Sequence, residues 1–208
     1  MNREEMKQRL EQVIDERRQV YLDLGKKIYE NPETGYREVK TTKTLADALE
    51  ALGYRTERGI AYTGCRAHAN EEKRRPKIAL LGELNALLCP SHPDCDKETG
   101  AMHACGHNVQ TTVMYGVADA LKYAGILDEL DGQIDFMAVP AEEGIELDYR
   151  EALKREGKIR YYRGTTELIA RGAFDDLDTC TMGHNLPFDQ PGIQLAHDTY
   201  SHAIQQKT

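Results

Sequence analysis

Three short blocks of this sequence contain side chains that could bind metal ions and transfer protons. They read His103-Ala104-Cys105-Gly106-His107-Asn108, Pro140-Ala141-Glu142-Glu143 and Gly183-His184-Asn185. A thiolate sulfur, a neutral imidazole nitrogen and a carboxylate oxygen are all good ligands for zinc, manganese, cobalt or nickel. A carboxylate that binds no metal can act as a general base. Together, the blocks supply the parts of a metal-dependent hydrolytic site.

The first block pairs Cys105 with His107. Two residues apart in an extended segment, their side chains would point the same way. The block also precedes a helix predicted for residues 109–124, with Asn108 as its N-cap. The dipole of that helix would favour the thiolate form of Cys105. The alternative is a buried structural cysteine beside a surface histidine, and this block alone does not separate the two interpretations.

The second and third blocks each follow a predicted strand. Glu142 and Glu143 come after an apolar run at residues 132–139 that Pro140 ends, and His184 ends a short strand at residues 179–183. In an open α/β sheet, ligands bind beyond the carboxyl ends of strands. One glutamate could then bind metal while the other acts as base. Taken singly, the glutamates are better explained as solvated loop residues and His184 as a packed side chain, so the combination carries the prediction.

Two weaker patterns are best explained without a site. Cys89, His92 and Cys95 lie close together, but two prolines and a missing fourth ligand favour an ordinary loop over a small zinc site. His197 and His202 in the last segment are expected to be surface residues.

The elements that must position the blocks follow from hydrophobic periodicity and turn residues. Helices are predicted at residues 3–30, which Asn31-Pro32 ends, at 39–52 with Gly53 as C-cap, and at 146–156 and 165–171. Strands are predicted at residues 54–57, 65–69 and 77–81, and a long loop at 82–107. This order of helices and strands predicts a layered α/β domain.

The composition limits the possible partners. The 208 residues carry a formal net charge of -8 and no basic stripe, which argues against a nucleic-acid partner. No run approaches the ~20 apolar residues that cross a bilayer, so no membrane partner is expected. Five cysteines without disulfide-like spacing and a polar N-terminus favour reduced thiols in a cytoplasmic protein.

Longer motifs resemble a known family. The segments Asn31-Pro32-Glu33-Thr34-Gly35-Tyr36-Arg37-Glu38 and Leu81-Gly82-Glu83-Leu84-Asn85-Ala86-Leu87, with the three blocks, are similar to aminoacylase-type metal-dependent amidohydrolases of peptidase family M20. The most similar branch contains aminobenzoyl-glutamate, hippurate and indole-acetyl-amino-acid hydrolases. The resemblance implies a three-layer α/β, aminopeptidase-like (zinc-exopeptidase) catalytic domain with a mixed, mainly parallel sheet, here truncated.

The resemblance also implies a site with two divalent metal ions, which could be Zn, Mn, Co or Ni. Cys105, His107, Glu143 and His184 would be ligands, with Cys105 as a candidate bridge, and Glu142 would be the general base. His103, Asn85 and Glu83 would surround the ligands. The implied reaction is hydrolysis of the amide bond of a small-molecule N-acyl amino acid or short peptide. Glu142 would take a proton from the attacking water and pass it to the leaving amine.

The sequence departs from the family at two points. Asn85 stands where family members usually have aspartate, so this position brings no charge to the metal shell. The chain is also about half the usual length. Residues 1–195 match the N-terminal part of the catalytic domain, and residues 196–208 match the start of a lid or dimerisation domain that is otherwise absent.

The length leaves other functions open. One alternative is a truncated, catalytically inactive fragment or a non-enzymatic binding domain that keeps the family fold. Another is that a separate polypeptide supplies the C-terminal half. A strand near residues 199–204 would leave an open edge, which predicts self-association into a homo-oligomer.

Overall fold

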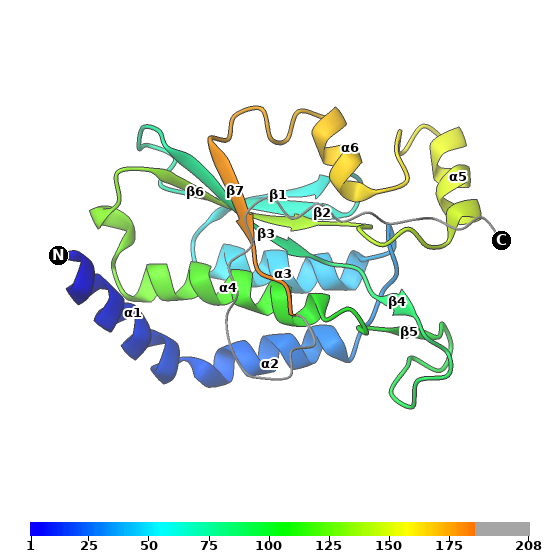
Figure 1. Cartoon of the computed structure of the whole chain (residues 1–208), viewed down its shortest axis with the longest axis horizontal. Coiled ribbons are helices and arrows are strands. Elements are labelled where there is room, and N and C mark those ends of the chain that lie inside the picture. Colours follow the sequence, from blue (N-terminus) through cyan, green and yellow to red (C-terminus); the bar gives the residue numbers. More distant parts are fainter. Residues whose placement is uncertain (186–208) are drawn as a thin grey trace.

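A five-stranded mixed sheet forms the middle layer of the computed structural model, which describes residues 1–185 (Figure 1). Its strands, in spatial order, are β1 (Arg55–Ile60), β2 (Gly64–Ala69), β6 (Gln133–Val139), β3 (Lys77–Glu83) and β7 (Thr179–Met182). β1–β2 and β2–β6 pair antiparallel, whereas β6–β3 and β3–β7 pair parallel. The predicted mixed sheet is therefore confirmed, with the parallel pairings gathered around β3.

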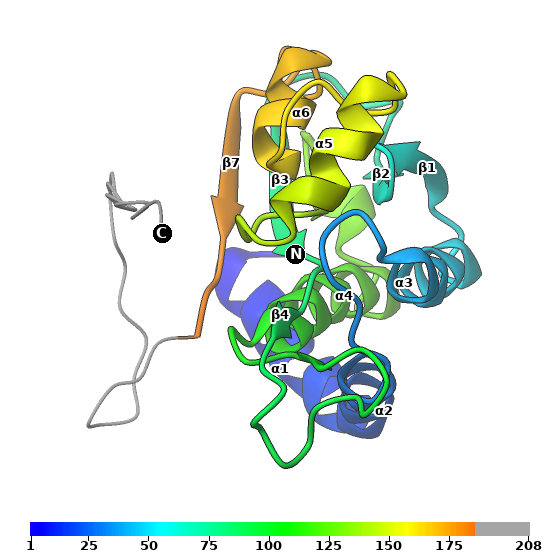
Figure 2. The ribbon, with the colours of Figure 1, turned by 90° about the vertical axis from the view of Figure 1, so that its right-hand side faces the viewer.

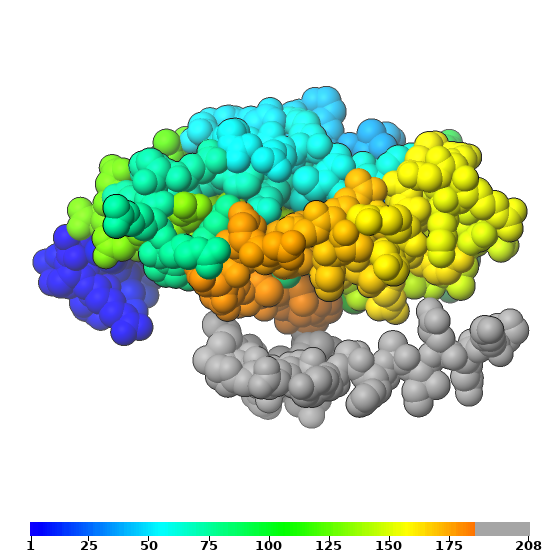
Figure 3. All heavy atoms as spheres, turned by 90° about the horizontal axis from the view of Figure 1, so that it is seen from above, coloured from blue at the N-terminus to red at the C-terminus, as the bar shows by residue number. Residues whose placement is uncertain are grey.

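Helices cover both faces of this sheet, as the predicted three-layer α/β domain requires (Figures 1 and 2). On one side lie α1 (Arg3–Glu16), α2 (Arg18–Tyr29), α3 (Val39–Ala51) and α4 (His107–Tyr123). On the other side lie α5 (Leu147–Arg155) and α6 (Gly164–Ala170). Figure 3 looks onto this second side, where α5, α6 and the segment that leads to β7 appear in yellow and orange.

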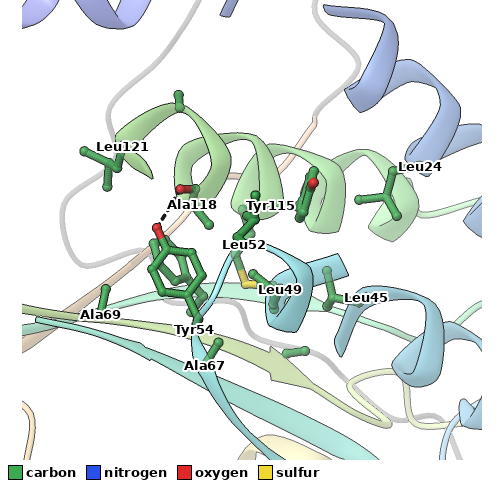
Figure 4. Packing of buried hydrophobic residues seen from close by; sticks show 14 of the residues in the cluster. Leu24, Leu45, Leu49, Leu52, Tyr54, Ala67, Ala69, Tyr115, Ala118 and Leu121 are labelled. Carbon is green, nitrogen blue, oxygen red and sulfur yellow. Dashed lines mark hydrogen bonds between the residues drawn. The ribbon is translucent and has the colours of Figure 1, made fainter. Parts of the chain in front are cut away.

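The central strand β6 is buried on both faces, which explains its continuous apolar sequence. Phe136 belongs to the large core formed with α3 and α4, and the next residue, Met137, packs with Leu168 of α6 on the opposite face. In the large core, the Tyr54 hydroxyl donates to the carbonyl oxygen of Ala118 at 2.7 Å (Figure 4). This bond ties the start of β1 to α4, the helix that follows the first block.

The prediction of one helix over residues 3–30 is wrong, because the chain breaks at Arg17. Arg17 has φ -102° and ψ 6°, and α2 begins at the next residue. Its guanidinium donates to both carboxylate oxygens of Asp119 at 2.5 and 2.7 Å and lies over the Tyr123 ring. Asp119 is fully buried on α4 and also accepts from the Tyr21 hydroxyl. A long-range ion pair thus ends a helix that local periodicity would continue.

Replacing Asp119 with alanine is expected to lower the free energy of unfolding by about 2–3 kcal/mol, because charged hydrogen bonds from Arg17 and Tyr21 would be lost. Urea unfolding followed by circular dichroism measures the change. Asp128→Ala, on an exposed position, is the matched control and should shift stability by less than about 0.5 kcal/mol. Equal effects of the two variants would contradict this account of the helix break.

The predicted loop at residues 82–107 contains a small hairpin of β4 (Leu87–Leu88) and β5 (Ala101–Met102). Between these strands, the Asp94 N–H donates to His92 Nδ1 at 3.1 Å and the Cys95 thiol donates to the Pro90 carbonyl oxygen at 3.5 Å. Within residues 1–185, neither His92 nor the two cysteines belong to a group of clustered metal-ligating atoms. These contacts agree with the ordinary loop expected here.

Most other elements were predicted within a few residues, including α3, β2, β6 and α5. Gly53, with φ +89°, follows α3 as expected for a helix end. The expectations for residues 196–208, which include the strand near 199–204, the self-association built on it, and His197 and His202, fall outside the described residues. In residues 1–185, no helix is long and apolar enough to span a bilayer.

Candidate metal centre

The three blocks meet where the parallel strands end. β3 ends at Glu83, β6 leads through Pro140 into Glu142, and β7 leads into His184. α4 begins at His107 and packs against β3. This is the edge of the sheet at which an open α/β fold places its ligands.

A left-handed glycine shapes the start of α4. Gly106 is the N-cap residue and has φ +82°, so His107 is the first helical residue. A Cβ atom on Gly106 would lie 2.1 Å from Asn185 Nδ2, which leaves room only for glycine. The predictions that Asn108 caps this helix and that Cys105 and His107 lie in an extended segment are therefore wrong, although both side chains still reach the site.

His107 is oriented with one ring nitrogen directed at the carboxylates. Its Nδ1 lies 2.7 Å from the carbonyl oxygen of Asn85, and since a carbonyl only accepts, Nδ1 carries the proton. In the neutral ring, Nε2 then has a free lone pair. It lies 3.1 Å from Glu83 Oε2 and 4.0 Å from Glu142 Oε2, yet it makes no hydrogen bond to a described residue, although the ring is buried. A buried, unpaired nitrogen facing carboxylates fits a metal ligand.

Cys105 and His184 form the second part of the cluster. Cys105 Sγ lies 3.4 Å from His184 Nε2, and His184 Nδ1 donates to the carbonyl oxygen of Asn185 at 2.8 Å. His184 therefore repeats the orientation of His107, with Nδ1 held by backbone and Nε2 directed inward. The ligand atoms of Cys105, His107 and His184 all lie within 4.8 Å of one another. The structure thus brings together three of the four ligands that the sequence predicts.

The site concentrates negative charge. Burial raises the pKa of the Cys105 thiol to about 12, and Glu143, Glu142 and Glu83 add to the shift. This outcome opposes the expected thiolate, because burial and three carboxylates outweigh the dipole of α4. A divalent cation reverses such a balance, since it deprotonates a coordinating thiol. The donor set therefore suits a metal ion better than it suits an empty site.

Glu142 is held from two directions. Its backbone N–H donates to the side-chain oxygen of Asn85 at 2.9 Å, and its carboxylate Oε1 lies 3.5 Å from Arg163 Nη1. Burial raises the pKa of Glu142, and Glu83 and Glu143 raise it further, against the lowering by His107 and Arg163. A raised pKa brings a carboxylate closer to the range that suits a general base at neutral pH.

The remaining residues around the site differ in how visible they were in the sequence. Among the described residues, His103 lies outside both groups of clustered ligand atoms, and burial, with His107 nearby, lowers its pKa to about 4. Arg163 had no sequence signal, because it is distant in the chain from Glu142. Gln110 and Thr111, one turn into α4, hold the backbone of Glu83 and could have been suspected only from their position after His107.

Comparisons with known proteins agree with this geometry. Residues 80–178 match the family described as Peptidase family M20/M25/M40. The chain carries a peptidase M20 domain. The YXEP protein of Bacillus subtilis, described as a dinuclear metal binding peptidase from the M20 family, superposes on 83% of this M20 chain with a TM-score of 0.66 and 26% identity.

Curated relatives of the M20 chain include amidohydrolases. IAA-amino acid hydrolase ILR1-like 4 of Arabidopsis thaliana is 36% identical over 126 residues, or 59% of this chain. One of the polypeptides of the p-aminobenzoyl-glutamate hydrolase of Escherichia coli is 29% identical over 181 residues, or 84% of this chain. The chain spans 28% and 34% of the lengths of these two relatives and 44% of the YXEP chain.

Proposed function

We propose that this chain belongs to a metal-dependent amidohydrolase in which Cys105, His107, Glu143 and His184 hold two divalent metal ions and Glu142 is the general base. The observation that carries the proposal is the convergence of Cys105 Sγ, His184 Nε2 and the unpaired His107 Nε2 beside Glu142. Metal ions bound there would polarise a substrate carbonyl and make water more acidic.

The chain's own residues would then manage the proton. Glu142 accepts it from the attacking water through a carboxylate that Asn85 and Arg163 keep in place. The same carboxylate returns the proton to the leaving amine when the amide bond breaks. Asn85 serves here with its backbone and side-chain oxygens, so its lack of charge does not prevent it from orienting His107 and Glu142.

We further propose N-acyl amino acids or short peptides as substrates. Named relatives include hydrolases of IAA-amino acids, of p-aminobenzoyl-glutamate and of hippurate, and each such compound joins an acyl group to an amino acid. A cytoplasmic location and completion of the site by a second copy or a separate C-terminal half are part of the same proposal. All five cysteines are free in the structure, which suits a reducing compartment.

Metal-dependent hydrolysis tests the proposal. The chain, stripped with a chelator, would be incubated with hippurate or p-aminobenzoyl-glutamate after separate addition of Zn²⁺, Mn²⁺, Co²⁺ or Ni²⁺. Release of free amino acid is expected only after metal addition, and Cys105→Ala is expected to abolish both metal retention and release. If no added metal restores release although metal binds, the binding-domain alternative replaces this one.

A further inference from the structure

Glu83 is fixed more firmly than a loop carboxylate near a metal site would be. It is the last residue of β3 and is 6% exposed. Its N–H donates to Gln110 Oε1 at 2.7 Å, and its carbonyl oxygen accepts from the Thr111 hydroxyl at 2.6 Å. Because both partners lie on α4, Glu83 is held against the helix that begins at His107.

The Glu83 carboxylate faces the unpaired nitrogen of His107. The 3.1 Å between Glu83 Oε2 and His107 Nε2 lacks the geometry of a hydrogen bond, and the lone pair of Nε2 points towards the anionic oxygens. This arrangement is unfavourable unless a positive charge lies between the two atoms. Two ligand atoms that share one ion at about 2.1 Å lie roughly 3–3.5 Å apart, which accommodates the observed separation.

Glu142 closes the same space. Its Oε2 lies 4.0 Å from His107 Nε2, and the ligand atoms of Glu83, His107 and Glu142 all lie within 4.8 Å of one another. The other oxygen of Glu142 faces Arg163. His107 Nε2 has a single lone pair, so it can bond only one ion, and its nearest anionic neighbour is Glu83.

We infer that Glu83 is a metal ligand that shares one ion with His107, while Cys105 and His184 hold the other. This inference rests on the proposed function and adds a ligand to it. The two positions differ in chemistry: carboxylate oxygen with imidazole suits Mn²⁺, whereas thiolate with imidazole suits softer ions such as Zn²⁺. The site therefore has one position for a hard cation and one for a softer cation.

Metal binding to single-residue variants tests this division. The chelator-treated chain would be titrated with MnCl₂, with free Mn²⁺ followed by electron paramagnetic resonance, and separately with Co²⁺, whose thiolate charge-transfer absorption reports on Cys105. Glu83→Gln is expected to weaken Mn²⁺ binding about 10–100-fold and to leave the cobalt–thiolate absorption unchanged. Glu98→Gln, which makes the same charge change on an exposed loop, should leave both signals at wild-type values.

A conservative variant guards against misfolding. Glu83→Asp keeps the charge but shortens the side chain, so Mn²⁺ affinity is expected to fall less than in Glu83→Gln, with a wild-type circular dichroism spectrum. Wild-type Mn²⁺ affinity in both variants, with the cobalt absorption intact, would overturn the role of Glu83 and leave the proposed function standing. Failure of the wild-type chain to bind either ion would overturn both.

Discussion

Replacing Glu142 with glutamine is expected to lower the rate of amide hydrolysis by about 10²–10⁴-fold, the usual contribution of a positioned general base. Glutamine keeps the size of the side chain and the backbone bond to Asn85, but it cannot accept the proton of the attacking water. Metal content should therefore remain close to that of the wild type. The loss should appear in kcat, because the group acts on the transition state.

The rate would be measured with each metal ion that supports wild-type activity, and metal content would be measured on the same samples. Glu98→Gln removes one negative charge from an exposed loop and serves as the control, with a rate expected within a factor of two of the wild type, a change of roughly 0.4 kcal/mol. Wild-type turnover by Glu142→Gln would remove this carboxylate from the proposed mechanism.

Replacing Arg150 with methionine is expected to lower the free energy of unfolding by about 3–5 kcal/mol, because it leaves a buried carboxylate without its cation. Arg150 is fully buried, and its Nη1 donates to the Tyr162 carbonyl oxygen at 2.7 Å. The nearby Glu38 is also fully buried and accepts from the Ala141 N–H at 2.7 Å, one residue before Glu142. Arg150 and Glu38 thus form a charged support beneath the turn that presents the proposed base.

The pH dependence identifies the cause of this loss. Burial raises the pKa of Glu38 from 4.5 to about 7 in the folded chain. A raised folded-state pKa means that the stability linked to Glu38 is complete below about pH 4.5 and is lost as pH rises through about 7. Without Arg150 the ionised carboxylate is still less favourable, so the destabilisation should be larger at pH 8 than at pH 5.

A double-mutant cycle provides the control for Arg150. Glu38→Gln removes the charge that Arg150 compensates, so Arg150→Met should cost less stability in the Glu38→Gln background than in the wild type. Urea unfolding of the four proteins at both pH values gives these differences. Additive losses that do not change with pH would show that Arg150 contributes through packing alone.

The sequence could predict the elements whose signals are local. The apolar run at residues 132–139 became β6 because both of its faces are buried, and Gly53 ended α3 because its φ of +89° favours glycine. The proposed metal ligands Cys105, His107 and His184 converge because β3, β6 and β7 end at one edge of the sheet and α4 starts there. Element order was sufficient for that expectation.

Contacts between distant residues were beyond sequence reasoning. The break at Arg17 depends on Asp119 and the contact of Glu142 with Arg163 depends on a later loop, and neither pairing has a local signature. Arg150 sits in a polar helix and would be taken for a surface residue, although it is fully buried. Asn108 has a side chain suited to an N-cap, but Gly106 took that position because Asn185 leaves no room for a side chain there.

The most direct test of the proposed metal centre is an anomalous diffraction measurement on crystals of the chain grown with Zn²⁺. We expect anomalous density within bonding distance, about 2.0–2.3 Å, of Cys105 Sγ, His107 Nε2 or His184 Nε2. Density only at other positions, or crystals grown with Zn²⁺ in which these three atoms contact water alone, would contradict the assignment of a metal centre to this edge of the sheet.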